Sequence, residues 1–529
     1  MKRSFLYFRY SLIVVMLCTM SKVSHAQNAT EVAYSVIQLP QELKLEDQVY
    51  EDINQDGLKD LALATSHRDR RYVRSVRIHF QQNSKPRFKN EPDHIVSLTS
   101  DVIAYACVDT DPHPGAEILL FTANACFGYR IQEESRDRIY KIAACDFLWQ
   151  LPDPHHVFSW QGAVLDFNSD GRVDLLLPRA DGFRVLLQGE TGFMPTSLLE
   201  VPRDKHVNRS NVRMDRDQSG GRLTVGFEGV GSFLGIDKRP QSLVSVHHDL
   251  SVPLFTDWNG DRRYDILTQT SSHMYLWQQG TQETFAHAPL EIPLPVDDRQ
   301  DTGMIVIATK QYVLDLNRDS CCDFILFTRD RHSKKRLFTQ VLVFINPNDA
   351  QSQNALFGDQ GIPQQLLKIA GEPGKAQLAD INGDGYPDLS FVTFRPDLLD
   401  QVKTLAAKAV KLQFLAFINH RGRFSPRPDL IQDVYVSVGE QENSNFDQGR
   451  FLVDFNKDGL LDVLVRDTKT HIGLRLLRKT KKGMQISKAD MWDTTIPEKA
   501  RLLYEHTQTP SEPVLLITSP DQIIHVRFP

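Results

Sequence analysis

The stretch Asp166-Phe-Asn-Ser-Asp-Gly-Arg-Val-Asp174 belongs to a pattern, Asp-x-Asn-x-Asp-Gly-x-x-Asp, that recurs down the chain. Four copies keep every position, and two more keep the four oxygen-bearing side chains but have Arg262 or Ser320 in place of the glycine. Oxygen side chains at positions 1, 3 and 5 can converge on one cation, and glycine permits the sharp turn with positive φ. Each copy therefore predicts a calcium loop. The candidate metal ligands are Asp52, Asn54, Asp56, Asp60, Asp166, Asn168, Asp170, Asp174, Asp257, Asn259, Asp261, Asp265, Asp315, Asn317, Asp319, Asp323, Asp380, Asn382, Asp384, Asp388, Asp454, Asn456, Asp458 and Asp462.

The start of the pattern also resembles the loop of an EF-hand, which requires a Glu at position 12 and a helix on each side. Position 12 is Leu63, Leu177, Phe391 or Val465 in the four complete copies. Each loop is followed at once by a short apolar run, such as Leu-Leu-Leu after Asp174, which is typical of a buried strand. The loops are therefore predicted to join two β-strands rather than two helices.

The spacing of the copies predicts the architecture. Their first aspartates lie at positions 52, 166, 257, 315, 380 and 454, and a degenerate copy, Asp109-Thr-Asp-Pro-His-Pro-Gly-Ala-Glu117, adds position 109. Most steps are close to 60 residues, which accommodates four strands, as residues 163–166, 174–177, 183–187 and 193–201 illustrate. Repeats of this kind predict an all-β propeller of four-stranded blades, with the Asp-rich calcium loops between the first and second strands.

The two ends of the chain are predicted to close the ring. Residues 501–526 supply three strands without a metal loop, and residues 32–40 supply a fourth. Pairing them removes an exposed sheet edge, which would otherwise invite aggregation. Seven units that contain an intact or degenerate aspartate loop, together with the closing unit, predict eight blades. Seven blades are the alternative.

Two segments interrupt the regular spacing. The step after Asp166 is 91 residues long and predicts an insertion near 203–250, although a degenerate loop at 215–221 is the alternative. A second insertion near 395–411 has the apolar spacing of a short amphipathic helix over 397–411.

The first 26 residues have the features of a secretory signal: a basic start, an apolar run over 11–20 and a Ser-His-Ala cleavage site. The propeller would then occupy residues 27–529, and the protein is expected to be exported, either periplasmic or secreted. Removing the signal would change the formal net charge from -6 to -10. An acidic chain of this kind does not favour nucleic-acid binding. No other segment is apolar enough to span a membrane, and we expect a monomer.

Five cysteines follow the predicted cleavage site. Cys107, Cys126 and Cys145 are expected on the first, third and fourth strands of one blade, where a Cys126–Cys145 disulfide and three buried thiols are both open. Cys321 and Cys322 lie at positions 7 and 8 of the fifth metal loop, and they are either ordinary thiols or a vicinal disulfide.

The loops on repeated four-stranded units resemble the FG-GAP and VCBS repeats, found in the propeller heads of integrin α chains and in many exported bacterial proteins. The resemblance covers nearly all of residues 30–529. Phe-Gly and Gly-Ala-Pro elements are mostly absent, so the bacterial VCBS type is more similar. The resemblance implies a propeller with structural calcium, but no single activity, because the scaffold serves adhesins, lectin-like proteins and some polysaccharide-degrading enzymes.

No hydrolase, zinc-protease or phosphate-loop motif is present, and the paired histidines 155–156 and 247–248 lie near strand ends, where they are usually not catalytic. The sequence therefore predicts an exported calcium-binding propeller that serves as a binding scaffold for a protein or glycan. The alternative is a lyase or hydrolase acting on polysaccharide.

Several turns between second and third strands are basic or enlarged, at 67–74, 329–336 and 395–411. These turns are expected on one face, opposite the metal loops, where they either bind an anionic partner or are merely solvated hairpin tips. The cations concerned are Arg68, Arg70, Arg71, Arg74, Arg331, Lys334, Lys335 and Arg336.

Overall fold

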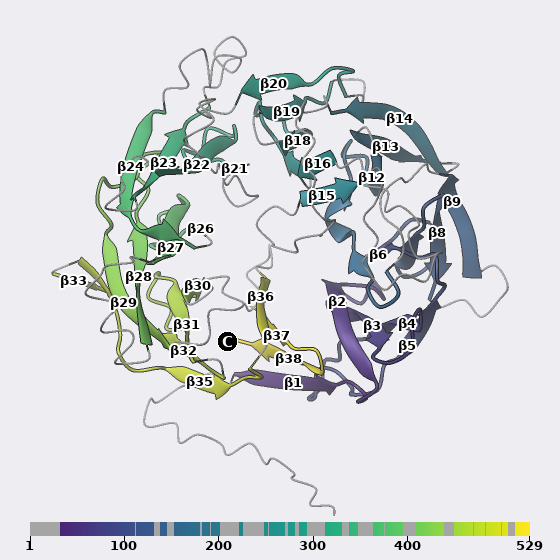
Figure 1. Cartoon of the computed structure of the whole chain (residues 1–529), viewed down its shortest axis with the longest axis horizontal. Helices are drawn as coiled ribbons and strands as arrows, with labels where there is room; N and C mark the ends of the chain where they lie inside the picture. Colours follow the sequence, from purple (N-terminus) through teal and green to yellow (C-terminus); the bar gives the residue numbers. More distant parts are fainter. Residues whose placement is uncertain are drawn as a thin grey trace, which may run out of the picture.

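The fold is a closed ring of eight small antiparallel sheets, seen in a computed structural model of the chain (Figure 1). Almost no helix is present in the part of the chain that the structure describes. The structure describes residues 32–111, 113–131, 138–144, 153–179, 182–190, 192–201, 222–225, 248–251, 253–269, 273–280, 285–293, 313–330, 338–346, 363–374, 376–394, 409–437, 449–468, 470–481, 483–498, 500–505 and 514–528.

Each blade is a four-stranded sheet, and successive blades follow the chain around the ring. Blades 1 to 4 comprise β2 (Leu43–Glu51), β3 (Asp60–His67), β4 (Arg74–His79) and β5 (His94–Leu98); β6 (Ala104–Val108), β7 (Glu117–Phe121), β8 (Ala125–Arg130) and β9 (Ile139–Ala144); β11 (Val164–Leu165), β12 (Asp174–Arg179), β13 (Gly182–Gly189) and β14 (Gly192–Glu200); and β17 (Leu254–Thr256), β18 (Asp265–Gln269), β19 (His273–Trp277) and β20 (Leu290–Pro293).

The second half of the ring repeats this plan. Blades 5 to 8 comprise β21 (Val313–Leu314), β22 (Asp323–Asp330), β23 (Phe338–Phe344) and β24 (Gln365–Ala370); β25 (Glu372–Pro373), β26 (Gln377–Ala379), β27 (Asp388–Phe394), β28 (Ala409–Phe417) and β29 (Leu430–Ser437); β30 (Gly449–Val453), β31 (Asp462–Thr468), β32 (His471–Arg475) and β35 (Trp492–Thr495); and β36 (Arg501–Glu505), β37 (Val514–Thr518), β38 (Gln522–Arg527) and β1 (Ala33–Gln38). In blade 6 both β25 and β26 pair with β27.

The predicted ring closure is confirmed. Strand β1 pairs antiparallel with β38, from Ala33 opposite Arg527 to Gln38 opposite Gln522, so the N-terminal strand completes the last blade. Figure 1 shows the two ends of the described chain side by side. The prediction of eight blades is also confirmed, and the seven-bladed alternative is wrong.

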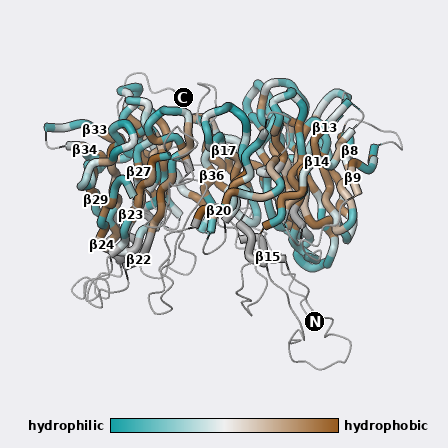
Figure 2. The backbone as a smooth tube through the Cα atoms, turned by 90° about the horizontal axis from the view of Figure 1, so that it is seen from above, coloured by the Kyte–Doolittle hydropathy of each residue, from teal (hydrophilic) through white to brown (hydrophobic). Residues whose placement is uncertain are grey.

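The core is distributed along the seams between blades rather than at one centre. Each of the seven buried apolar clusters contains side chains from neighbouring blades, such as Ile37 of blade 8 with Leu61 of blade 1. Apolar residues therefore lie along the strands, and hydrophilic residues gather at the turns on both faces (Figure 2). A blade buries its two sheet faces only when it has a neighbour on each side, so closure of the ring matters to every blade.

Six elements of the described residues lie outside the regular plan, and two of them, β33 (Leu477–Thr480) and β34 (Gly483–Ile486), form a hairpin in blade 7. Strand β10 (Phe158–Ser159) adds to blade 2 by pairing parallel with β6, and a 3-10 turn at Gln161–Ala163 follows it. Strands β15 (Arg222–Val225) and β16 (His248–Ser251) pair only with each other, between blades 3 and 4. Residues 395–408 of the predicted insertion, and with them most of the helix predicted over 397–411, lie outside the described residues. Residues 409–411 are not helical but belong to strand β28, because they pair with β29.

The described cysteines lie where the strand prediction placed them. Cys107 is on β6 and Cys126 on β8, and both are buried, whereas Cys145 lies outside the described residues. Cys321 and Cys322 are free thiols, so the vicinal disulfide is wrong. None of the described helical residues forms a segment long and apolar enough to cross a membrane.

Candidate metal centres

All six predicted loops connect the first strand of a blade to the second. They lie between β2 and β3, β11 and β12, β17 and β18, β21 and β22, β26 and β27, and β30 and β31. Positions 4 and 6 of every loop have positive φ, including the non-glycine residues Arg262 at 68° and Ser320 at 74°. The loop shape is therefore the same whether or not position 6 is glycine, and these two loops adopt it against the preference of an L-residue.

The side chains at positions 1, 3 and 5 are gathered inside each loop. In the first loop, the backbone N–H of Asp56 lies 3.1 Å from Asp52 Oδ1 and 2.9 Å from Asn54 Oδ1. The Asn54 amide in turn donates to Asp56 Oδ2 at 3.1 Å. Two oxygens that accept from one N–H must lie near one another, so the structure brings these three predicted ligands together. The loops at 166, 257, 315, 380 and 454 repeat both acceptor contacts with distances of 2.9–3.2 Å.

The aspartate at position 9 has a different setting. In all six loops it is fully buried. Asp60 Oδ2 accepts the N–H of Ile53 at 3.0 Å, and Asp60 Oδ1 accepts the N–H of Gln81 at 2.8 Å, after the third strand. The same two bonds recur at Asp174, Asp265, Asp323, Asp388 and Asp462. The ninth aspartate thus ties the loop to the sheet, and its role as a calcium ligand stays a prediction.

The pKa values of these buried carboxylates are raised above the ordinary value for aspartate. Burial, followed by repulsion from carboxylates in the same loop, raises the pKa of Asp60, Asp174 and Asp462 to about 6. The same causes raise the pKa of Asp265, Asp323 and Asp388 to about 7. A divalent cation beside the loop would relieve this repulsion.

The loops carry the kind of donor atoms that calcium prefers, but these atoms are not arranged as a complete coordination shell. Each offers three carboxylates and an amide oxygen, which are the hard ligands calcium takes. Within the described residues, however, no three His, Cys, Asp or Glu side chains converge closely enough to hold a metal ion. The carboxylates at positions 1 and 5 instead accept N–H groups of their own loop.

Loops are bonded to the next blade around much of the ring. The carbonyl at position 2 accepts a hydrogen bond from the next blade at five seams. The donors are Ala116 N to Ile53 O at 2.7 Å, Gln188 Nε2 to Thr110 O at 2.5 Å, Asn346 Nδ2 to Trp258 O at 2.7 Å, Asn419 Nδ2 to Leu316 O at 2.8 Å and Leu461 N to Ile381 O at 2.9 Å. Each of these bonds connects a loop of one blade directly to the next blade.

Three of those donors are side-chain amides that the sequence analysis did not identify. Gln188 lies in the last part of the third strand, and Asn346 and Asn419 follow theirs. At each position the backbone N–H bonds to the ninth aspartate of the same blade, and the side-chain amide bonds to the preceding blade. Gln81 and Gln279 occupy the same place and bond their own ninth aspartate. A Gln or Asn at the end of the third strand in five of these six blades was the available signal, whereas blade 7 has Leu477 there.

The degenerate loop of blade 2 contains a protein cation. Arg130 Nε and Nη2 lie 2.8 and 2.7 Å from Asp111 Oδ2, and His113 Nδ1 lies 2.7 Å from Asp111 Oδ1. Burial tends to raise the pKa of Asp111, but the bonds from His113 and Arg130 outweigh it and lower that pKa. Glu117 replaces the ninth aspartate and accepts the Thr110 N–H at 2.7 Å. The bond from the second position to the ninth is thus kept in this loop, and its Asp111 carboxylate is neutralised by a guanidinium of the chain itself.

Only some of the described cations of the basic turns are exposed, as the hypothesis of an anion-binding face requires. Arg70 and Arg71 are exposed, and Arg68 pairs with Asp521. The prediction that Arg74 is a surface cation is wrong. Arg74 is 3% exposed and donates to the carbonyls of Asp153, His156 and Thr99. The cations Arg331, Lys334, Lys335 and Arg336, like residues 395–408, lie outside the described residues.

The paired histidines are not gathered into a site. His156 Nδ1 lies 3.1 Å from Glu46 Oε2, in a polar contact between blades 1 and 2. His248 lies on β16, and His247 lies outside the described residues.

Comparisons with known proteins add no family. No family model matches the chain, and no curated protein matches it. Solved structures that match include an Agrocybe aegerita lectin described for recognition of non-reducing terminal N-acetylglucosamine, with 15% identity over 85% of this chain and 93% of that chain and a TM-score of 0.35. A Lactobacillus plantarum protein has 11% identity over 87% and 98%, with a TM-score of 0.32. The V. cholerae biofilm matrix protein Bap1 has 11% identity over 94% and 88%, with a TM-score of 0.25. These similarities are too low to bear on function, and the propeller architecture rests on the strand pairing itself.

Proposed function

We propose that this chain is an exported propeller of the FG-GAP or VCBS type, stabilised by calcium, that serves as a binding scaffold outside the cytoplasm for a protein or glycan. The observation that supports it best is the repetition of one oxygen-rich loop at the same place in six of the eight blades. Side chains at positions 1, 3 and 5 are gathered in each loop, and a buried, electrostatically strained aspartate lies behind them.

In this proposal calcium has a structural task. Each loop is bonded to two strands of its own blade through the ninth aspartate, and five seams bond the loop to the next blade. A cation that neutralises the loop carboxylates would hold these bonds in place. The turns and the outer strands remain available to a partner, and function then depends on surface groups rather than on the metal.

Export rests on the features of residues 1–26, and it explains why calcium is the expected ion. Outside the cytoplasm calcium reaches concentrations at which extracellular modules of weak affinity are filled. A signal-dependent appearance of the protein in the periplasm or medium tests this part, and retention of the full-length chain in the cytoplasm would contradict it.

The calcium part is tested by metal analysis of the purified protein. About six calcium ions per chain are expected, and a chelator should lower the melting temperature by many degrees, because a ligand that binds the folded state stabilises it by mass action. Asp384→Asn should remove one ion and a fraction of the calcium response, whereas Asn90→Asp, outside the loops, should leave the count unchanged. A melting curve insensitive to chelator, together with no bound calcium, would refute the proposal.

A further inference from the structure

Blade 7 carries a hairpin that has no place in the four-stranded plan. Strands β33 (Leu477–Thr480) and β34 (Gly483–Ile486) are inserted between β32 and β35 and pair only with each other. This hairpin, here called the arm, projects from the outer edge of the ring (Figure 1) and is hydrophilic (Figure 2).

The arm is anchored at its base. Leu477 is fully buried, and its N–H bonds to the ninth aspartate of the blade, Asp462, at 2.8 Å. Met484 and Ile486 pack with Leu477 against the apolar cluster between blades 6 and 7. The base of the arm is therefore a fixed part of this seam.

The arm is strongly basic within an acidic chain. Residues 475–489 contain six lysines and arginines and no acidic residue, while the whole chain has a formal net charge of -6. Arg478, Lys479, Lys481 and Lys488 are exposed. Arg475 is balanced by Asp490, whose Oδ1 lies 2.7 Å from Arg475 Nε. The remaining cations have no acidic residue within the arm to neutralise them, so they attract an anion.

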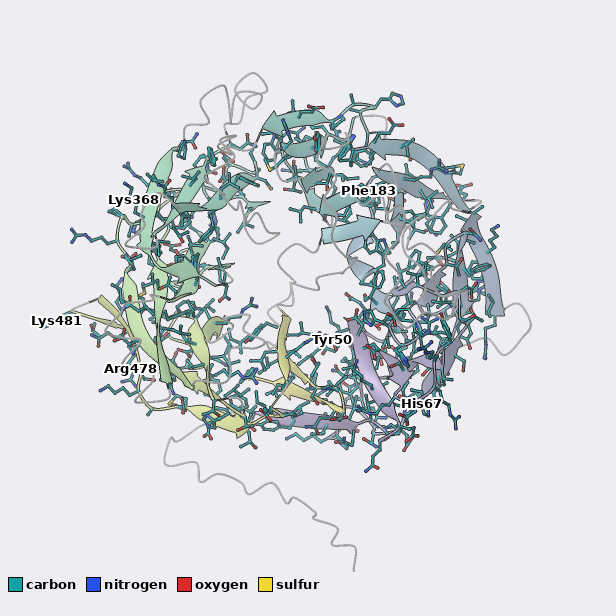
Figure 3. All side chains as sticks on the ribbon, viewed as in Figure 1. Tyr50, His67, Phe183, Lys368, Arg478 and Lys481 are labelled. Atoms are coloured by element: carbon teal, nitrogen blue, oxygen red, sulfur yellow. The ribbon has the colours of Figure 1, made fainter. Side chains whose placement is uncertain are left out.

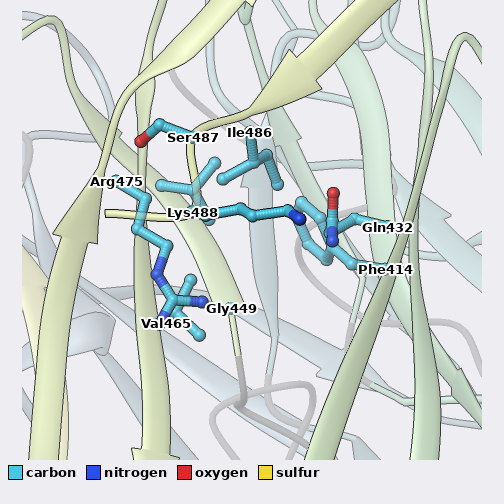
Figure 4. Close-up of a pocket in the computed structure, with 9 residues that line it drawn as sticks. Phe414, Gln432, Gly449, Val465, Arg475, Ile486, Ser487 and Lys488 are labelled. Atoms are coloured by element: carbon cyan, nitrogen blue, oxygen red, sulfur yellow. The ribbon is translucent and has the colours of Figure 1, made fainter. Parts of the chain in front are cut away.

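A small cavity lies under the base of the arm, between blades 6 and 7 (Figure 4). Its volume is about 130 Å³. The Lys488 side chain extends along it toward Gln432, with Arg475 on another side (Figure 4). The apolar part of the lining comes from Phe414, Val463, Val465 and Ile486, and the polar part from Gln432, Arg475, Ser487 and Lys488.

We propose that the arm and this cavity together bind an acidic polysaccharide whose charge is carried by carboxylates. A sugar carries apolar C–H groups, hydroxyls and, in a uronate, one carboxylate. The cavity offers an apolar wall, the Gln432 amide and the Lys488 ammonium at the same place, while the Ser487 hydroxyl is already bonded to Leu476 N and Ala489 O. The cations of the arm then contact further carboxylates of the polymer. This inference rests on the proposed function and names its ligand class and its place.

Charge and chemistry favour a polysaccharide over the other polyanions. Single-stranded nucleic acid is usually bound by aromatic side chains on which bases stack. The described arm, residues 477–481 and 483–488, contains no aromatic residue. An acidic protein surface would complement the positive charge of the arm but would not fill the small cavity. Binding of an acidic protein is therefore one of the outcomes of the test.

The test compares two reversals of two charges each. The arm variant is Arg478→Glu with Lys481→Glu, and the matched control is Arg70→Glu with Arg71→Glu. The control side chains are exposed on the turn after His67 of blade 1, two blades away from Arg478 and Lys481 of blade 7 (Figure 3). Binding to polygalacturonate, measured by calorimetry at low salt, should weaken at least tenfold in the arm variant and stay within twofold in the control. Lys488→Met, which keeps the apolar stem, should weaken binding at least threefold. Raising salt should weaken wild-type binding.

Further probes separate the alternatives. Dextran should not bind, because it has no charge. Equal losses in the arm variant and the control would overturn the proposal, since net charge would then explain binding. Tighter binding of polyglutamate or dextran sulfate than of polygalacturonate would also overturn it, in favour of an acidic protein or a sulfated polymer. If no anionic polymer binds while a neutral glycan or a protein does, this inference fails and the proposed function stands. Unchanged melting curves of all variants are the folding control.

Discussion

The guanidinium of Arg130 lies on the carboxylate of Asp111, with Nε and Nη2 at 2.8 and 2.7 Å from Oδ2. Arg130 also lies over the Tyr140 ring, 4.3 Å from its centroid, and Tyr140 bonds through Thr110 to Glu117. Asp111 stands at position 3 of the degenerate loop, where the six other loops have asparagine. A side-chain cation therefore neutralises a carboxylate of this loop, and blade 2 should not depend on calcium.

Arg130→Leu should destabilise the protein by about 1–3 kcal/mol, less than the loss of a fully buried pair, because both side chains retain some exposure. The loss relative to wild type should be the same with excess calcium and with excess chelator, and urea unfolding under both conditions measures it. Adding Asp111→Asn should recover part of the stability, since it removes the carboxylate left without its partner. A loss that calcium abolishes would show that the loop is a metal site after all.

The sixth position of each loop gives a second prediction. Gly57 has φ of 84° and an added Cβ would meet nothing within 4 Å, so Gly57→Ala tests backbone conformation alone. It should cost about 1 kcal/mol, whereas Arg262→Gly, at φ of 68°, should gain about 0.5–1 kcal/mol. Thermal unfolding of the two variants measures both effects. Opposite signs are expected, and a stabilising Gly57→Ala would contradict the argument.

Much of the fold could be predicted because the repeated loop marks strand ends. Asp60, Asp174 and Asp388 each begin a second strand as predicted, since the ninth position must enter the sheet to accept two backbone N–H groups. The closing strand was predictable for a different reason. A unit with one strand too few needs a partner, and the residues after the predicted signal supplied an apolar one.

The contacts between blades could not be predicted, because they depend on loop lengths that vary. The amide that follows the third strand lies 14 residues after the ninth aspartate at Gln188 but 23 at Asn346 and 31 at Asn419. No fixed spacing identifies it. Arg74 illustrates the same limit, because its turn looks solvated in sequence while residues 153–156, far along the chain, cover it. The basic arm was overlooked since it lies beyond the third strand, not in a turn between strands two and three.

Ring closure gives a third prediction. Deleting residues 32–40 should destabilise the whole protein, because it exposes the edge of β38 and opens the cluster that joins blades 8 and 1. A finer test uses two neighbours on β1. Ile37 is 2% exposed and Val36 is 48% exposed, so Ile37→Ala should cost about 2–5 kcal/mol and Val36→Ala less than about 0.5 kcal/mol. A truncated protein that unfolds at the same urea concentration as the intact one would contradict closure.

The last prediction concerns Glu46, which lies between blades 1 and 2. Its burial tends to raise the pKa, but bonds from His156 at 3.1 Å and Ser66 at 2.7 Å, with the charge of Lys44, lower that pKa to about 2. The folded state thus holds the ionised form more tightly than the unfolded state does. The resulting stability is present above about pH 4.5 and is lost as the pH falls from there toward 2, by about 2–3 kcal/mol in full. Glu46→Gln should therefore lower stability at neutral pH and flatten its decline below pH 4.5, whereas Glu42→Gln, at an exposed position, should change neither. Urea unfolding across this pH range measures the slopes, and parallel curves for wild type and Glu46→Gln would show that the carboxylate makes no such contribution.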